Sequence, residues 1–472
     1  MSSVPKAKRK EYGQFFTNVT TAKFMASLFC FDFSKSKIEI LDAGAGTGIL
    51  ASAVLQRLIE EEYIGEIHVT CYETDNLVIA LLKENMELSS RLPNISYTIK
   101  NENYITSQDF SKQTLFSKDV CQYDYIIGNP PYKKIAKDAV EALAIPEVCH
   151  GAPNLYFLFW AMGIQNLKEG QELVYIIPRS WTSGAYFKKF REFLFSKCVI
   201  TDIHLFESRD KVFKGESVLQ ETIIIKIKKT STIPNYISIT ASSTSDFNDI
   251  RRFYAPYDVV VAKNHFVYLV TNEEDAKILR TINQFNMTLP EINLKMQTGL
   301  IVDFRTREVL RNELEEGAYP LLYSQHIKDG KIVWPQGKEG EVIKTDKKSY
   351  LQENCDFLIV KRFTSKEESR RLQCGIYLKK EYDNFKYIST QNKVNFIKCD
   401  SPSLAYGLYV LLNSTLYDCY YRILNGSTQV NSTEINQMPV PERQMIEEMG
   451  KELMHQELSV VNCNKILSKW IK

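Results

Sequence analysis

A β-strand, a glycine-rich turn and an α-helix follow one another near the start of the chain and leave few folds open. The apolar run Ile38–Leu41 predicts the strand, and Ile49–Glu61 predicts the helix. Between them, small residues would let a ligand approach the backbone at a helix N-terminus, as in nucleotide-binding βα units. The glycine spacing differs from that of the dinucleotide fingerprint. We therefore predict an α/β domain whose bound ligand touches Asp42, Ala43, Gly44, Gly46 and Gly48.

Two further strands are predicted to end at the same ligand. The strand His68–Tyr72 ends in an acidic residue, which is the position that accepts hydrogen bonds from ribose hydroxyls in such sheets. Asp75 is expected to cap the helix Leu77–Leu88, so Glu73 is the residue expected to contact the ribose. A third strand, Pro93–Lys100, is followed by polar residues. The residues expected here at the ligand are Glu73, Thr74, Asn103 and Tyr104.

A proline-stiffened loop follows the buried strand Tyr125–Gly128. In Asn129-Pro130-Pro131-Tyr132 the prolines fix φ and remove two backbone donors. The Asn129 side-chain oxygen and the Pro130 carbonyl form a rigid pair of acceptors beside the Tyr132 ring. This arrangement suits a planar substrate with an exocyclic amino group. The alternative is an ordinary surface turn in which Asn and Pro are turn formers.

These motifs, in this order and after the arm Tyr12–Thr17, resemble the γ-class amino-methyltransferases that modify N6 of adenine in DNA. The resemblance continues through a strand Leu173–Pro178, a helix Tyr186–Phe195 and a strand Val218–Lys228, and covers roughly residues 10–230. It implies a Rossmann-like, S-adenosylmethionine-dependent methyltransferase sheet with helices on both faces. It also implies cofactor contacts from Thr17 and Asn129. The sequence departs from the family at Asn103, where an acidic residue usually holds the amino group of the cofactor's adenine.

The resemblance implies a positioning reaction on an extruded base. Two acceptors on the amine would localise its lone pair for in-line attack on a methyl group, so no Ser/His/Asp constellation and no metal is required. The base must leave the duplex, and Phe187 matches the position whose ring covers its second face. The predicted catalytic residues are Asn129, Pro130, Pro131, Tyr132 and Phe187.

Length and composition limit the number of domains and the class of protein. A chain of 472 residues needs more than one core, and we expect a catalytic domain at 1–235, connecting elements at 236–290 and a C-terminal α+β target-recognition domain at 291–472. A net charge of +2 neither demands nor excludes nucleic acid. No signal peptide or bilayer-length apolar run is present, and ten cysteines lack metal-site spacing. These features are typical of a cytoplasmic bacterial protein with reduced thiols.

The C-terminal half combines cations, hydroxyls and aromatic residues in a way that fits phosphate anchoring and base reading. A Tyr-rich helix is expected over Leu404–Leu424, a polar loop after it, and a helix near the end of Glu442–Lys472. The basic segment and the loop resemble the BsuBI/PstI group of modification methylases, which implies the inner adenine of CTGCAG. The residues expected to contact DNA are Lys361, Arg362, Arg370, Arg371, Ser427, Thr428 and Gln429.

The expected partner is double-stranded DNA, and the protein is expected to bind it as a monomer. A cognate restriction endonuclease is expected to be associated with it functionally but not physically. Other methyl acceptors remain open, because Asn-Pro-Pro-Tyr also occurs in enzymes acting on release-factor glutamine and ribosomal RNA guanine. A large C-terminal domain argues against the glutamine enzymes. Cytosine N4 transfer uses the same chemistry, usually with Ser in place of Asn129. An inactive DNA-binding specificity module is the remaining alternative, which failure to bind S-adenosylmethionine would favour.

Overall fold

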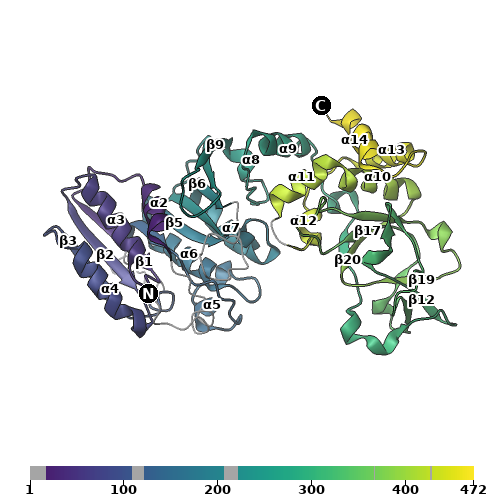
Figure 1. Cartoon of the computed structure of the whole chain (residues 1–472), viewed down its shortest axis with the longest axis horizontal. Coiled ribbons are helices and arrows are strands. Elements are labelled where there is room, and N and C mark those ends of the chain that lie inside the picture. Colours follow the sequence, from purple (N-terminus) through teal and green to yellow (C-terminus); the bar gives the residue numbers. More distant parts are fainter. Residues whose placement is uncertain (1–16, 109–121, 207–221, 366, 426–427, 472) are drawn as a thin grey trace. The chain divides into compact units, whose positions relative to one another are not determined.

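The chain divides into two compact units, Met1–Glu273 and Glu274–Lys472 (Figure 1). The structure, a computed structural model, describes residues 17–108, 122–206, 222–365, 367–425 and 428–471. The part of the arm before Thr17, residues 218–221 of the predicted strand Val218–Lys228 and the predicted DNA contact Ser427 lie outside the described residues. The division falls inside the stretch expected to connect the domains.

A mixed sheet forms the centre of the first unit, in the order β3-β2-β1-β4-β5-β7-β6-β8-β9. The first five strands run parallel, and β7 is antiparallel to both of its neighbours. The chain order reverses between β1 and β4, and ligands bind at the carboxyl ends of strands at such a point. The strands are β1 (Lys37–Ala43), β2 (Glu66–Tyr72), β3 (Ile95–Lys100), β4 (Tyr123–Gly128), β5 (Leu167–Pro178), β6 (Cys198–Phe206), β7 (Thr222–Lys229), β8 (Tyr236–Ser242) and β9 (Arg251–Pro256).

Helices cover both faces of this sheet, as the sequence predicts. The core on one face joins alternate strand residues such as Ile38, Ile40 and Val69 to helices α2, α3 and α4. On the other face α6 lies close to β5, since a Cβ on Gly163 would lie 2.9 Å from Leu173 Cδ1. The helices of this unit are α2 (Val19–Ser27), α3 (Ile49–Glu60), α4 (Asn76–Ser89), α5 (Val140–Ala144), α6 (Leu155–Asn166), α7 (Lys188–Phe195) and α8 (Tyr257–Val260).

Asn18 caps α2, because its side chain accepts a hydrogen bond from Thr21 N at 2.7 Å. One local expectation differs from the structure. The Ser- and Thr-rich stretch expected to link the domains instead supplies β8 and β9.

A buried, hydrogen-bonded histidine explains why this polar stretch can form strands of the sheet. His204 of β6 lies 2.9 Å from Thr240 Oγ1 and 3.1 Å from Ser242 Oγ. Burial lowers the pKa of His204 to about 3. Polar strand residues are tolerated inside the sheet here because they have hydrogen-bond partners.

The second unit has two sheets, with strand orders β10-β20-β17-β18-β14-β13 and β11-β15-β12-β19-β16. The longer strands are β12 (Ala318–Leu322), β17 (Asp356–Lys361), β18 (Cys374–Tyr377), β19 (Tyr387–Thr390) and β20 (Val394–Cys399). The shorter strands are β10 (Met296–Thr298), β11 (Leu310–Arg311), β13 (Ile327–Lys328), β14 (Lys331–Ile332), β15 (Val342–Lys344) and β16 (Gln352–Glu353). The helices are α9 (Glu273–Asn283), α10 (Pro402–Asn413), α11 (Thr415–Leu424), α12 (Ser432–Ile435), α13 (Arg443–Leu453) and α14 (Val460–Leu467).

The long helix expected over Leu404–Leu424 is two helices. Ser414 separates them, because its ψ of 153° is extended and its hydroxyl accepts a hydrogen bond from Tyr417 N at 3.3 Å. The serine therefore ends α10 and caps α11. None of the helices in the described ranges is long and apolar enough to cross a membrane.

Candidate functional site

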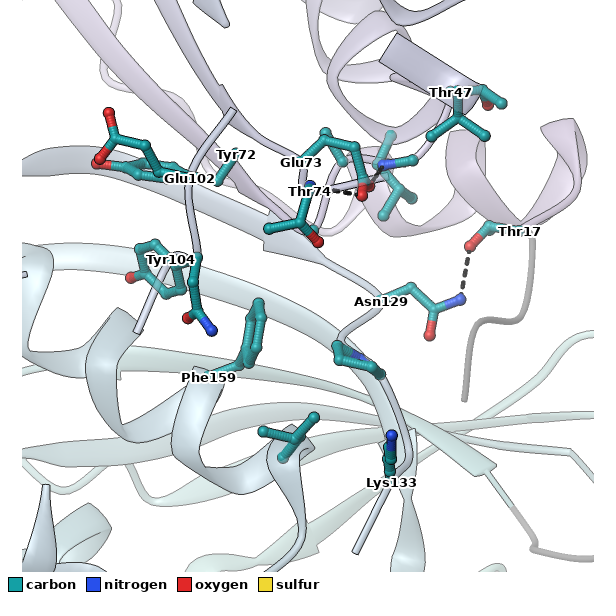
Figure 2. A pocket seen from close by; sticks show the side chains of 18 of the residues that line it. Thr17, Thr47, Tyr72, Glu73, Thr74, Glu102, Tyr104, Asn129, Lys133 and Phe159 are labelled. Atoms are coloured by element: carbon teal, nitrogen blue, oxygen red, sulfur yellow. Dashed lines mark hydrogen bonds between the residues drawn. The ribbon is translucent and has the colours of Figure 1, made fainter. Parts of the chain in front are cut away.

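A cavity of about 260 Å³ lies at the carboxyl ends of the central parallel strands (Figure 2). It brings together three of the predicted motifs: the glycine bend, the end of β2 and the Asn-Pro-Pro-Tyr loop. Its lining residues are Thr17, Gly44, Ala45, Gly46, Thr47, Ile49, Leu50, Tyr72, Glu73, Thr74, Val78, Glu102, Asn103, Tyr104, Asn129, Pro131, Lys133, Glu141, Leu155 and Phe159.

The glycine bend has a backbone that other residues would strain. Gly44, Gly46 and Gly48 have φ values of 74°, 55° and 77°, which glycine adopts without steric cost. A Cβ at Gly48 would also lie 2.6 Å from Leu82 Cδ1 on α4. The backbone N–H groups of Gly44 and Ala45 both donate to the Tyr72 carbonyl, at 2.9 Å. The bend is thus fixed to the end of β2, and at Gly44 and Gly46 it presents backbone rather than side chains to the cavity.

Glu73 holds the bend from the β2 side. One carboxylate oxygen accepts a hydrogen bond from Gly46 N at 2.8 Å, and the other accepts from Thr74 N and Asp75 N, each at 2.8 Å. The side chain is buried yet lines the cavity. Two carboxylate oxygens offer about four lone-pair sites, so three backbone bonds leave capacity for a ligand hydroxyl.

Asp42 lies behind the cavity wall rather than on it, as do Ala43 and Gly48. Its Oδ2 accepts a hydrogen bond from Ala51 N at 3.1 Å, whereas no donor among the described residues reaches Oδ1. Burial, with a smaller contribution from Glu73, raises the pKa of Asp42 to about 7. The predicted contacts of Asp42, Ala43 and Gly48 with a ligand remain predictions.

Asn103 lines the cavity with its side chain held by other groups. Its Oδ1 accepts a hydrogen bond from Ile105 N at 3.0 Å, and its Nδ2 donates to Glu141 Oε1 at 2.9 Å. Glu141 lies in the first turn of α5 and also lines the cavity. A carboxylate therefore stands next to the position where the resembled family has its own acidic residue. Sequence reasoning missed Glu141 because no motif marks the segment that carries it.

Two aromatic rings line the cavity together with Asn103 and Glu141. Tyr104 and Phe159 have centroids 5.4 Å apart at 46° (Figure 2). The Tyr104 hydroxyl donates to Asn166 Oδ1 at 2.7 Å, and burial raises its pKa well above the usual range. The ring is therefore a neutral, fixed wall. Phe159 was also missed, because a phenylalanine within an apolar helix is indistinguishable from a core residue.

Asn129 has its side-chain amide fixed at both ends. Its Nδ2 donates to Thr17 Oγ1 at 3.1 Å (Figure 2), and its Oδ1 accepts from the Tyr132 hydroxyl at 2.8 Å. The Tyr132 hydroxyl also lies 2.9 Å from the Ile176 carbonyl on β5. Neighbours on both sides thus determine which way the amide faces.

The predicted pair of base-covering rings is joined through a third ring. Tyr156 lies 6.2 Å from Tyr132, edge to face at 84°, and 5.8 Å from Phe187 at 31°. Neither Tyr132 nor Phe187 belongs to the lining of the cavity. Phe187 packs against Phe157 as well, at 5.4 Å. Tyr156, which the sequence analysis did not select, connects the two elements.

The second unit brings two predicted DNA-contacting segments together. Thr364 N donates to the Thr428 carbonyl at 3.1 Å, and Val430 N donates to the Arg362 carbonyl at 2.7 Å. The Arg362 side chain is half-buried and reaches Asn392 O at 2.9 Å and Gln429 Oε1 at 3.4 Å. The basic segment and the polar loop therefore form one surface.

The other predicted cations differ in exposure. Lys361 pairs with Glu368 at 3.0 Å, and Arg370 donates to the Ser414 carbonyl at 3.1 Å. Arg371 is fully buried, where Nε donates to Thr364 Oγ1 at 3.1 Å and its backbone N–H donates to Asp418. A buried guanidinium cannot reach a phosphate, so the expectation of a DNA contact at Arg371 is revised to a structural role.

Comparisons with known proteins identify relatives of this chain. Residues 18–213 match the family described as Eco57I restriction-modification methylase. The chain is 37% identical over 456 residues to the type II methyltransferase M.BsuBI of Bacillus subtilis, covering 94% of this chain and 90% of that protein. It is 32% identical over 483 residues to the type II methyltransferase M.PstI of Providencia stuartii, covering 99% and 94%.

Among solved structures, the type IIL restriction-modification enzyme MmeI in complex with DNA matches with a TM-score of 0.54 and 13% identity, covering 98% of this chain and 72% of that chain. A nuclease-deletion mutant of the type ISP enzyme LlaGI matches with a TM-score of 0.51 and 11% identity, covering 96% and 56%. At these identities the two matches show likeness of fold alone.

Proposed function

The chain belongs to the Eco57I restriction-modification methylase family, and on that premise we propose that it transfers a methyl group from S-adenosylmethionine to N6 of an adenine in duplex DNA. Its relatives M.BsuBI and M.PstI are named type II methyltransferases, which supports DNA methylation within a restriction-modification system. One observation carries the finer claim: the fixed amide of Asn129 lies in a loop that lines the same cavity as the glycine bend.

The residues of the cavity fit S-adenosylmethionine. Gly44 and Gly46 let a ligand approach the backbone of the bend closely because they carry no side chains. Glu73 retains acceptor capacity for ribose hydroxyls. Tyr104 and Phe159 offer apolar faces for a purine ring. Glu141, aligned by Asn103, offers a carboxylate oxygen for an exocyclic amine. We assign recognition of the cofactor's adenine to Asn103 and Glu141 together, because both ends of the Asn103 amide already make hydrogen bonds.

The cofactor, when bound, supplies an activated methyl group. The task of the protein is to make the target amine nucleophilic and to hold it in line. The lone pair of an aromatic amine is delocalised into the ring, and acceptors on its N–H bonds localise it. Asn129 Oδ1 and the Pro130 carbonyl serve as these acceptors. The Tyr132 hydroxyl donates a hydrogen bond to Asn129 Oδ1, and an amide oxygen can accept hydrogen bonds at two lone pairs.

Adenine is favoured over cytosine because an amide stands at position 129, where N4-cytosine enzymes usually have serine. The rings of Tyr132, Tyr156 and Phe187 provide the stacking faces that an extruded base needs. Unit 2 is proposed to read the DNA through Lys361, Arg362, Arg370, Thr428 and Gln429. The resemblance of this segment to the BsuBI/PstI group implies the site CTGCAG.

Transfer of labelled methyl from S-adenosylmethionine to duplex DNA tests the proposal. Digestion of the product to nucleosides should place the label in N6-methyladenine, and duplexes that lack CTGCAG should take up no label. Label in N4-methylcytosine would favour the cytosine alternative, and label in RNA or protein would favour the other acceptors. A protein that binds duplex DNA but not S-adenosylmethionine would be the inactive specificity module.

A further inference from the structure

Beside the catalytic loop, three side chains from separate segments meet on the surface of unit 1. The Lys134 ammonium lies 5.6 Å from the centroid of the Tyr186 ring, within cation–π distance. The His150 ring lies 6.3 Å from the same ring, tilted by 48°. The Tyr186 side chain nevertheless remains 61% exposed. We call Lys134, His150 and Tyr186 the mouth cluster.

The backbone holds the mouth cluster in place. Leu155 N donates to the Lys133 carbonyl at 2.8 Å and Ile135 N donates to the Pro153 carbonyl at 2.9 Å, so Lys134 pairs opposite Asn154. Gly151, at φ 74°, turns the chain beneath the edge of the Tyr186 ring, where a Cβ would lie 3.6 Å from Cε1. One edge of the ring is therefore backed by a loop while most of its surface faces solvent.

Positive charge is concentrated next to this exposed ring. Lys133, Lys134 and Lys137 fall within one short segment, in a chain whose net charge is only +2. Lys133 also lines the cavity. Within the described ranges, neither Lys133 nor Lys134 pairs with a carboxylate, unlike Lys361 and Lys226 in the same protein. An uncompensated ammonium beside an exposed aromatic face suits a ligand with both an anion and an apolar ring or sugar.

The mouth cluster adjoins both elements that would hold the extruded base. Lys134 lies two residues beyond Tyr132, and Tyr186 immediately precedes Phe187. A nucleotide held between those elements remains joined to its strand by a phosphate on each side. The flanking phosphate and sugar of the strand must therefore lie along residues adjacent to Tyr132 and Phe187.

We propose that the mouth cluster binds the DNA backbone flanking the extruded nucleotide, with Lys134 on a phosphate and Tyr186 against the adjacent sugar or base. The proposal rests on the proposed function, since it names where the catalytic unit itself grips the target strand. The contact is made to phosphate and sugar and reads no base itself, unlike the base-reading surface proposed for unit 2. Its signature is therefore a contribution of Lys134 to the salt dependence of binding to DNA that contains CTGCAG.

The test measures the dissociation constant for short duplexes with and without CTGCAG across a series of salt concentrations. Lys134→Gln should lower the slope of log affinity against log salt by about 0.9, the value for one lost phosphate contact. Tyr186→Leu should weaken binding with an unchanged slope. The control is Lys83→Gln, which removes an exposed lysine from the middle of α4 and should leave affinity and slope unchanged. Calorimetry with S-adenosylmethionine should show that all three variants still bind the cofactor.

A Lys134→Gln protein with the wild-type slope would overturn the inference, as would an equal loss of slope in Lys83→Gln. The proposed function would survive either result, provided that the wild-type protein methylates DNA. A wild-type protein that binds the cofactor but neither binds nor methylates duplex DNA would instead overturn both proposals.

Discussion

The Asn129 side-chain nitrogen donates a hydrogen bond to the Thr17 hydroxyl across 3.1 Å, and this bond, together with the one from the Tyr132 hydroxyl to Asn129 Oδ1, determines which way the amide faces. An amide can present either oxygen or nitrogen, and only the oxygen accepts a hydrogen bond from a substrate amine. Thr17 occupies the nitrogen end and so directs the oxygen away from itself. We thus interpret Thr17, which sequence analysis assigns to the cofactor, as a positioning residue for Asn129 as well.

Thr17→Val should separate these two roles. Valine keeps the shape but removes the acceptor, so kcat for methyl transfer should fall roughly threefold to tenfold, the effect of one hydrogen bond. Thr17→Ser retains the hydroxyl and should restore kcat. The dissociation constant of S-adenosylmethionine, measured in parallel, reports a cofactor contact of the Thr17 hydroxyl separately from its effect on kcat. A kcat unaffected by valine would show that the amide is oriented by other groups.

Tyr132 offers a second test of the same amide. Tyr132→Phe removes the hydrogen bond to Asn129 Oδ1 but keeps the ring, so we expect a loss in kcat of roughly threefold to tenfold. Tyr132→Ala also removes a stacking face, worth about 1–3 kcal/mol per base, and should additionally weaken DNA binding. Equal DNA affinities in the two variants would contradict a stacking role for the ring.

Glu141 should contribute to cofactor affinity without belonging to any motif. Glu141→Gln replaces a charged acceptor and should weaken S-adenosylmethionine binding about tenfold to a hundredfold, the range for a hydrogen bond to a charged group. Glu102→Gln is the matched control, since Glu102 is an exposed carboxylate at the same cavity and makes no hydrogen bond with another described residue. If both variants bind the cofactor as the wild type does, the adenine amine is recognised elsewhere.

Asp42 should make stability depend on pH in a direction opposite to that of most carboxylates. Burial raises its folded-state pKa to about 7 from the ordinary 3.8. Stability from this group is therefore fully present below the unfolded pKa and is lost as pH rises towards 7. Asp42→Asn removes this titration. Thermal melts of the cofactor-free protein should show the variant gaining stability relative to the wild type between about pH 4 and pH 7. A constant difference across that range would contradict the shifted pKa.

The sequence predicted the parallel strands of unit 1 well because each is an apolar run followed by small or polar residues at its carboxyl end. The cavity therefore gathers residues such as Gly46, Glu73 and Asn129 that local patterns had selected. The same reasoning treated β8 as a linker, because its Ser and Thr residues are polar. Their hydrogen bonds to His204 come from a strand distant in sequence, and no local pattern reveals that partner.

Contacts between distant segments account for the other differences. Glu141 meets Asn103 only after the chain has crossed β4 and the catalytic loop. Arg371 looks like a DNA-binding cation in sequence, yet Thr364, Asp418 and Asn425 enclose it. Ser414 splits an apolar helical pattern because its hydroxyl caps the following turn. In each case a hydrogen-bond partner remote in sequence, or a cap, outweighs the periodic signal.

The central claim is that the Asn129 oxygen activates an adenine amine, and Asn129→Ala tests it most directly. The variant should bind S-adenosylmethionine with nearly wild-type affinity in calorimetry, since Asn129 is one of many residues around the cavity. Its transfer of labelled methyl to CTGCAG-containing duplex DNA should be lost. Methylation at the wild-type rate by Asn129→Ala would contradict the account.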